Sequence, residues 1–379
     1  MHPRHVYVHV PFCARRCSYC DFAIAVRRVV PVADYLTALD RELALRFPDA
    51  RAAAVDTLYL GGGTPSRLGA AGVARMLDVT RSRFTPEDGA EVTLEANPED
   101  VTAEAARAWR SAGVTRLSLG SQSFDDRVLA WMHRVHDAAA IPRAVDAARS
   151  AGFRSLSLDL IFALPAALAR DWDRDLREAL ALAPEHLSLY GLTVEPGTPL
   201  GRWTARGEAS EAPEERYEAE FLLADEALGA AGFEHYEVSN FARPGQRARH
   251  NSAYWARRPY VGIGPGAHEF DGERRRWNVG AYPEWARRLA AGTDPLAADE
   301  TLSADDRATE EVYLGMRSAT GLELAPDELD VPGEWVARGW ATFAQNRLSL
   351  TPLGWLRLDA LAASMASRRT RRLTVHPSR

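Results

Sequence analysis

The 379-residue chain has three cysteines and no lysine. All 46 basic residues are arginine, which excludes enzymes that bind pyridoxal phosphate through a lysine Schiff base. No apolar run approaches the ~20 residues that a membrane-spanning helix needs. The first residues read as a strand over 6–10 and not as a signal peptide. A net charge of −6 excludes a general attraction to nucleic acid or to anionic lipid.

The three cysteines all lie in one short stretch, as Cys13, Cys17 and Cys20. Three thiols cannot all pair as disulfides, and no nearby Cys or His completes a tetrahedral zinc site. An iron–sulfur cubane normally takes one cysteine per iron, so three would leave one iron open. Buried, unreactive cysteines are the plain alternative, but chance would scatter them along the chain. We predict a 4Fe-4S cluster on these residues and, because free thiols need a reducing compartment, a cytoplasmic protein.

Short apolar runs rich in β-branched residues alternate with helical patterns between residues 6 and 196. Helices end in Ala-Gly pairs at 112–113, 151–152 and 231–232, where glycine suits a left-handed C-cap. Such a series predicts parallel strands with functional groups at their carboxyl ends. We therefore expect an α/β fold built on a partial (β/α)6 TIM-like barrel. The predicted strands are 6–10, 57–60, 91–94, 116–119, 155–161 and 186–192.

The character of the chain changes after about residue 200. Residues 1–205 are expected to form the barrel, and 206–295, rich in aromatic residues, arginine, glycine and proline, are expected to close it. A helical pattern with a short strand and turn predicts a small, mostly helical C-terminal domain over 296–366, with a winged form as one alternative. The basic, polar tail 367–379 is expected to lack order.

Glycine-rich and polar segments follow the predicted strands, at 61–65, 95–98 and 120–124. Together with the CxxxCxxC spacing after the first strand, they give the sequence a strong resemblance to the radical SAM superfamily. That resemblance implies that S-adenosylmethionine (SAM) chelates the open iron through its amino and carboxylate groups. Glycines would let backbone carbonyls approach the methionyl ammonium, although a simple tight turn is the plain alternative.

Further segments narrow the resemblance. Residues 7–13, 61–66, 95–98 and 120–124, with Asp159 ahead of 164–165, are similar to the oxygen-independent coproporphyrinogen III oxidase family through nearly the whole chain. The resemblance implies SAM contacts at the matching positions. Carboxylates and amides suit ribose hydroxyls, and arginine suits a carboxylate, although each residue alone would read as a surface or cap residue. The implied SAM residues are Tyr7, Tyr19, Gly62, Gly63, Thr64, Glu95, Gln122, Arg134 and Asp159.

The sequence departs from the oxidase itself in two places. The oxidase has a further cysteine two residues after the third ligand, where this chain has Phe22. It also has a long segment before the cluster, whereas this chain reaches Cys13 almost at once. Both departures are shared with a sister branch, the HemW-type haem chaperones. Resemblance to that branch implies haem handling in place of decarboxylation.

A His-Asn-x-x-Tyr-Trp motif of the same branch stands at 250–255 and marks the region 206–295 as haem-binding. The resemblance implies that His250 binds haem, and a histidine can ligate the iron axially. Tyr254 and Trp255 can border the porphyrin plane. A structural loop packed on the barrel mouth is the plain alternative, and His268 is a second candidate ligand. Four arginines near the motif can pair with propionates: Arg247, Arg249, Arg257 and Arg258.

Two functions fit these features. The first is a haem chaperone that carries the cluster, binds SAM and delivers haem to apoproteins such as respiratory enzymes. The second is oxygen-independent coproporphyrinogen III oxidase, in which radical SAM chemistry converts propionates to vinyl groups. Fold cannot separate them, and Phe22 favours the first. Whether the chain is an enzyme stays open.

Other radical SAM functions fit less well. A pyridoxal-phosphate-dependent aminomutase is excluded by the missing lysine, and an RNA methylthiotransferase is disfavoured by the acidic charge and by the lack of cysteines for a second cluster. Family resemblance also suggests a peripheral association with the inner membrane. The oligomeric state is open, with a homodimer among the alternatives.

Overall fold

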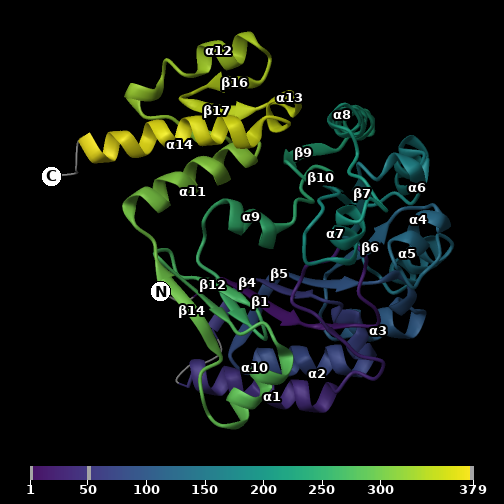
Figure 1. Ribbon diagram of the computed structural model, residues 1–379. Coiled ribbons are helices and arrows are strands. Elements are labelled where there is room, and N and C mark those ends of the chain that lie inside the picture. Colours follow the sequence, from purple (N-terminus) through teal and green to yellow (C-terminus); the bar gives the residue numbers. More distant parts are fainter. Residues whose placement is uncertain (1–2, 49–52, 376–379) are drawn as a thin grey trace.

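The computed structural model describes residues 3–48 and 53–375 (Figure 1). Within these residues nine strands form one sheet, in the order β11-β1-β4-β5-β6-β7-β8-β10-β9. The run from β11 to β8 is parallel, and β10 is antiparallel to both β8 and β9. The bounds are β1 His5–Val10, β4 Ala53–Gly62, β5 Phe84–Ala96, β6 Arg116–Gln122, β7 Leu156–Phe162, β8 His186–Gly191, β9 Glu234–Glu237, β10 Asn240–Ala242 and β11 Val261–Ile263.

Helices follow the parallel strands and cover the outer face of the curved sheet (Figure 1). The predicted α/β fold with six strand–helix units is confirmed. Each of the six predicted strands overlaps an observed strand and extends beyond it by at most one residue. The strand β11 has no counterpart among the predictions. The helices are α1 Val32–Arg46, α2 Gly69–Arg81, α3 Ala103–Ser111, α4 Asp126–Trp131, α5 Ala140–Ser150, α6 Trp172–Ala181, α7 Pro199–Ala205 and α8 Glu214–Ala230.

Side chains of β1 alternate between the outer and the inner face of the barrel sheet. On β1 the three valines Val6, Val8 and Val10 are fully buried in the hydrophobic core with residues of α1 and α2. The residues between them face the interior, where Tyr7 stacks on Tyr59 of β4 with ring centroids 6.0 Å apart. Successive side chains of a strand point to opposite faces of the sheet. The alternation of apolar and polar residues along the strand therefore gives the barrel an apolar outer layer and a polar interior.

One buried carboxylate joins α1 to the chain after β11. Glu42 is fully buried and accepts hydrogen bonds from Arg46 Nη1 at 2.7 Å and from Trp285 Nε1 at 2.8 Å. It also accepts the backbone N–H of Gly264 at 2.9 Å and the Asn278 amide at 2.6 Å. A buried charge needs such partners, so these contacts hold the segment after β11 against α1.

The segment after β10 contains α9 (Arg249–Trp255) and a second sheet in the order β12-β13-β14. This sheet continues to Thr301, beyond the predicted division at 295. It is followed by a group of helices around a small antiparallel sheet, which lies above the barrel in Figure 1 with α13 beside α8. The remaining bounds are β12 His268–Phe270, β13 Arg274–Asn278, α10 Tyr282–Ala290, β14 Leu296–Thr301, α11 Ala304–Arg317, β15 Leu322–Glu323, α12 Pro332–Ala337, β16 Ala341–Ala344, β17 Arg347–Leu350, α13 Pro352–Trp355 and α14 Leu358–Val375.

The expectation that the tail from residue 367 lacks order is wrong as far as Val375, because α14 extends to that residue. Arg369 explains why: its Nη2 lies 2.7 Å from Glu328 Oε2 in a buried ion pair, and it also donates to the Glu323 carbonyl. The last four residues, 376–379, lie outside the described part of the chain. None of the described helices is long and apolar enough to cross a membrane.

We predict that Glu42→Gln lowers the free energy of unfolding by about 2 kcal/mol, because the change removes one of the two carboxylates that pair with the buried Arg46 and leaves Glu269 as the other. Urea unfolding followed by tryptophan fluorescence measures this. The control Glu226→Gln, on the exposed face of α8, should stay within about 0.5 kcal/mol of the parent. Equal stability of the two variants would contradict the role assigned to Glu42.

Candidate functional site

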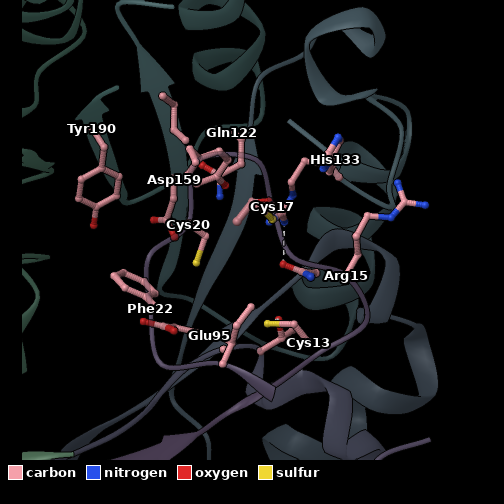
Figure 2. A pocket seen from close by; sticks show the side chains of 18 of the residues that line it. Cys13, Arg15, Cys17, Cys20, Phe22, Glu95, Gln122, His133, Asp159 and Tyr190 are labelled. Carbon is pink, nitrogen blue, oxygen red and sulfur yellow. Dashed lines mark hydrogen bonds between the residues drawn. The ribbon is translucent and has the colours of Figure 1, made fainter. Parts of the chain in front are cut away.

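A cavity of about 410 Å³ lies at the carboxyl ends of the barrel strands. Figure 2 shows the sulfur atoms of Cys13, Cys17 and Cys20 around it, with Phe22 and Glu95 beside them. Polar residues that end separate strands therefore meet in one place, as the parallel arrangement predicts. The residues predicted from sequence that line this cavity are Cys13, Cys17, Tyr19, Cys20, Gly62, Gly63, Thr64, Glu95, Gln122, Arg134 and Asp159.

The loop that carries the cysteines is held from several sides. Cys13 ends the short strand β2 (Phe12–Cys13), which pairs with β3 (Ala25–Val26) and so folds the loop back on itself. In the middle of the loop, the Ser18 N–H donates to the Met132 carbonyl at 3.1 Å, and the Ser18 carbonyl accepts from Leu200 N–H at 2.8 Å. These backbone contacts fix where the thiols point before any metal binds.

The three thiols suit a cluster better than a single ion. Within the described residues, no group of three His, Cys, Asp or Glu side chains could hold one metal ion. The thiols instead surround a shared cavity, which suits a multi-iron cluster ligated by one cysteine per iron. Burial raises the pKa of Cys13 and brings the pKa of Cys20 to about 11. A bound metal would replace those protons, because a coordinating thiol is deprotonated outright.

The glycine run after β4 lets the backbone come close to the cysteine loop. A Cβ added to Gly63 would lie 2.7 Å from the Pro11 carbonyl and 3.1 Å from Cys13 Sγ. Gly62 has a φ of 113°, a conformation that only glycine adopts readily. Thr64 follows, and its Oγ1 lies 3.4 Å from Cys13 Sγ. The run is thus a close approach of two backbones and more than a simple tight turn.

Two carboxylates face the cavity from β5 and β7 in different settings. Glu95 accepts the Tyr59 hydroxyl at 2.7 Å and the Gly62 N–H at 3.0 Å, and burial raises its pKa to about 7. Asp159 accepts from Ser118 Oγ at 3.1 Å, and burial raises its pKa as well. Both are acceptors of the kind that bind hydroxyl or ammonium groups of a ligand.

Arg134 links the cysteine loop to two strand ends. Its Nη2 donates to Asn97 Oδ1 and to the Gly120 carbonyl, each at 2.7 Å, and its Nη1 lies 3.5 Å from Cys17 Sγ. The guanidinium is buried at this position and Arg134 lines the cavity. A fixed cation beside the thiols can pair with an anionic cluster or with a ligand carboxylate.

Tyr7 is the one predicted SAM residue that does not line the cavity. Tyr7 lies one layer further from the carboxyl end of β1 than His9. The Tyr7 hydroxyl donates to His9 Nδ1 at 2.9 Å, and His9 Nε2 donates to the Ala23 carbonyl at 3.1 Å. Burial lowers the pKa of His9 to about 4, so the ring is neutral and joins β1 to the end of the cysteine loop. His9 was not among the predicted site residues, although it lies two residues from Tyr7 in the same motif.

Two exposed aromatic side chains stand at the mouth of the cavity. Phe22 is 61% exposed and Tyr190, near the end of β8, is 45% exposed. Both line the cavity in Figure 2. Phe22 stands two residues after Cys20, and the described residues that line the cavity hold three thiols. Tyr190 belongs to none of the sequence motifs. Only its position near the end of a predicted strand could have marked it as a residue of the site.

The structure does not bring His250 to this cavity. His250 is 1% exposed, at the amino ends of β1 and β4, with Nδ1 2.7 Å from Thr57 Oγ1 and Nε2 2.7 Å from the Tyr254 hydroxyl. Its ring stacks on Tyr59 with centroids 5.1 Å apart, and burial lowers its pKa to about 3. Both ring nitrogens are therefore engaged by hydroxyl groups of the barrel and of α9 in this structure, and haem binding by His250 stays a prediction.

Known proteins match the chain over nearly its whole length. The family model of the radical SAM superfamily matches residues 7–179. The heme chaperone HemW of Mycobacterium tuberculosis is 41% identical over 369 residues, which cover 96% of this chain and 95% of that protein. The heme chaperone HemW of Escherichia coli is 38% identical over 377 residues, which cover 95% of this chain and 97% of that protein.

Among solved structures, coproporphyrinogen III oxidase (HemN) from Escherichia coli, a radical SAM enzyme, matches with a TM-score of 0.81. The match covers 97% of this chain and 90% of that chain at 22% identity, so it establishes the fold alone. The family resemblance indicated by the cysteine spacing and the strand-end motifs is confirmed. The chain belongs to the radical SAM superfamily and, within it, to the family of the heme chaperone HemW proteins.

Proposed function

We propose that the cavity holds a 4Fe-4S cluster on Cys13, Cys17 and Cys20 and binds SAM at its open iron. The bound cluster would supply an electron to the sulfonium of SAM. Glu95 and Asp159 are placed to accept hydrogen bonds from ligand hydroxyl or ammonium groups, and Gly62 and Gly63 let the backbone at the cavity lie close against His9 and the cysteine loop. The buried Arg134 supplies a compensating positive charge beside the cysteine loop.

The function that fits best is a haem chaperone, which binds haem and passes it to haem-dependent apoproteins. The observation that carries this proposal is Phe22, which leaves three thiols at the cavity in a chain whose curated relatives are named heme chaperone HemW. Delivery to respiratory enzymes, a homodimer and docking at the membrane surface belong to the same proposal.

Coproporphyrinogen III oxidase is the second candidate. The fold of HemN supports it, and the radical SAM superfamily includes such enzymes. The oxidase fold does not decide the reaction, because one fold hosts several chemistries. The exposed apolar ring of Phe22, where the oxidase family has a further cysteine, is the specific difference.

Cys17→Ser should lose most of the bound iron and the anaerobic iron–sulfur absorbance, because two thiols cannot hold a cubane. Iron and sulfide analysis after anaerobic reconstitution measures this. The neighbouring variant Ser18→Ala is the control, since the Ser18 hydroxyl is buried without a hydrogen-bond partner among the described residues. Equal iron content in the two variants would remove the cluster from this loop.

The reconstituted protein should not convert coproporphyrinogen III to protoporphyrinogen, because Phe22 stands in place of the oxidase cysteine. The assay contains SAM and a reductant, and its products are separated by chromatography. The solved oxidase, run in parallel, is the positive control. Product formation at a comparable rate would make this chain an oxidase and overturn the chaperone proposal.

His250→Ala should weaken haem binding several-fold while the absorption maximum of bound haem stays in place. The reason is that the ring anchors α9 through Thr57 and Tyr254 and does not present a nitrogen to iron. Haem titration gives the affinity, and the Soret band reports the axial ligand. A shifted Soret band in His250→Ala would instead make His250 the ligand, with the Tyr254 hydroxyl displaced.

A further inference from the structure

A second cavity, of about 460 Å³, lies between α9 and the C-terminal helices. Its size falls in the range of small-molecule sites, ~300–1,000 Å³. In Figure 1, α9 stands between the barrel strands and α11, so the cavity separates the two parts of the chain. We call it the α9 cleft. Residues of the α9 segment that line it are Arg247, Ser252, Trp255 and Arg257.

Arg257 occupies a backbone position that favours glycine. It follows the end of α9 with a φ of 52°, and its N–H donates to the Tyr254 carbonyl at 3.0 Å. Next, the Arg258 N–H donates to the Ala253 carbonyl at 2.9 Å, which completes a left-handed C-cap. A side chain at such a position is strained, and strained residues concentrate at functional sites. The arginine side chain therefore needs a reason to be there.

The Arg257 guanidinium is poorly satisfied within the protein. Its nearest carboxylate is Glu310, with Nε 3.8 Å from Oε2, and the buried Nε has no hydrogen-bond partner among the described residues. Glu310 is already paired with Arg275. By contrast, Arg247 at the same cleft lies 2.9 Å from Glu234. Arg347, the third arginine that lines the cleft, is paired with Glu323 at 3.0 Å, so Arg257 is the arginine of the cleft that has no carboxylate partner of its own within 3.5 Å among the described residues.

A flat apolar wall lies beside this cation. Trp255 lines the cleft, and Arg317 stacks over its ring at 4.7 Å from the centroid. The Trp255 indole N–H is buried without a partner among the described residues. A cleft that offers an aromatic face and an unsatisfied guanidinium suits a ligand with a flat ring and carboxylates.

The structure also separates the four arginines near the His-Asn-x-x-Tyr-Trp motif. Arg247 and Arg257 line the α9 cleft, whereas Arg258 lines a different cavity beside His5 and Phe270. Arg249 is bound to the barrel, with its Nη1 2.8 Å from the Gly89 carbonyl. Neighbours in sequence therefore face different cavities, and this gives a matched control for Arg257.

We infer that the α9 cleft binds a tetrapyrrole by its propionate carboxylates, with Arg257 as the main cation and Trp255 as the wall for the ring. This inference rests on the proposed haem-handling function and names its binding site. No histidine or cysteine is among the described residues that line the cleft. Recognition therefore depends on the carboxylates and the ring and not on the iron, so iron-free protoporphyrin binds as haem does.

The test compares Arg257→Gly with Arg258→Gly in the full-length protein. Glycine suits the backbone at 257, so Arg257→Gly keeps or raises the melting temperature while it removes the guanidinium. We expect protoporphyrin to bind Arg257→Gly about tenfold or more weakly than the parent, because a charge-assisted contact is lost. Arg258→Gly should bind as the parent does. Fluorescence titration with iron-free protoporphyrin measures all three proteins.

A chemical variant of the ligand isolates the carboxylates. Protoporphyrin dimethyl ester should bind the parent about tenfold more weakly than the free acid, and this difference should vanish in Arg257→Gly. If the parent binds neither haem nor protoporphyrin, the proposed function fails and the inference with it. If the parent binds both but Arg257→Gly binds equally well, or Arg258→Gly alone is weakened, haem handling stands and the α9 cleft is not the site.

Discussion

The polar interior of the barrel is the constraint on which the rest of the structure depends. Curved parallel strands turn every second side chain inward, and a buried polar group must find a partner. Tyr59 shows how this is met: its hydroxyl donates to Glu95 above, and its ring stacks on His250 below. The same column of rings and carboxylates that fills the barrel also aligns the groups at both of its ends.

Sequence patterns predicted the barrel and the cluster loop well because both depend on local signals. Six apolar runs and the cysteine spacing were sufficient to predict the barrel and the three thiols, and the family resemblance supplied the eight other predicted residues that line the cavity. The strand β11 was missed because it has three residues, lies among glycines and gains its stability by pairing with β1. Its existence depends on a partner that is more than 250 positions away along the chain.

Composition does not report the tertiary contacts that residues 367–375 and His250 make in the folded chain. Residues 367–375 have the composition of a basic, polar tail. Arg369 nevertheless pairs with the buried carboxylate of Glu328, and the helix continues to Val375. His250 stands in a motif that resembles a ligand site, yet the burial of its two nitrogens follows from Thr57, which lies 193 positions earlier. Only the folded chain shows which face of α9 meets the barrel and which face is free.

The location of α9 at the amino ends of the strands affects how such a protein can diverge. The cysteine loop grows from the opposite end of the same barrel, and residues that share no partners contribute to stability almost additively. Apart from His250, which shares Tyr59 with Glu95 of the cavity, residues around α9 can therefore change with little effect on the thiols, and residues near the thiols with little effect on α9. A lineage built on this scaffold can exchange one end for a new task while it inherits the other intact.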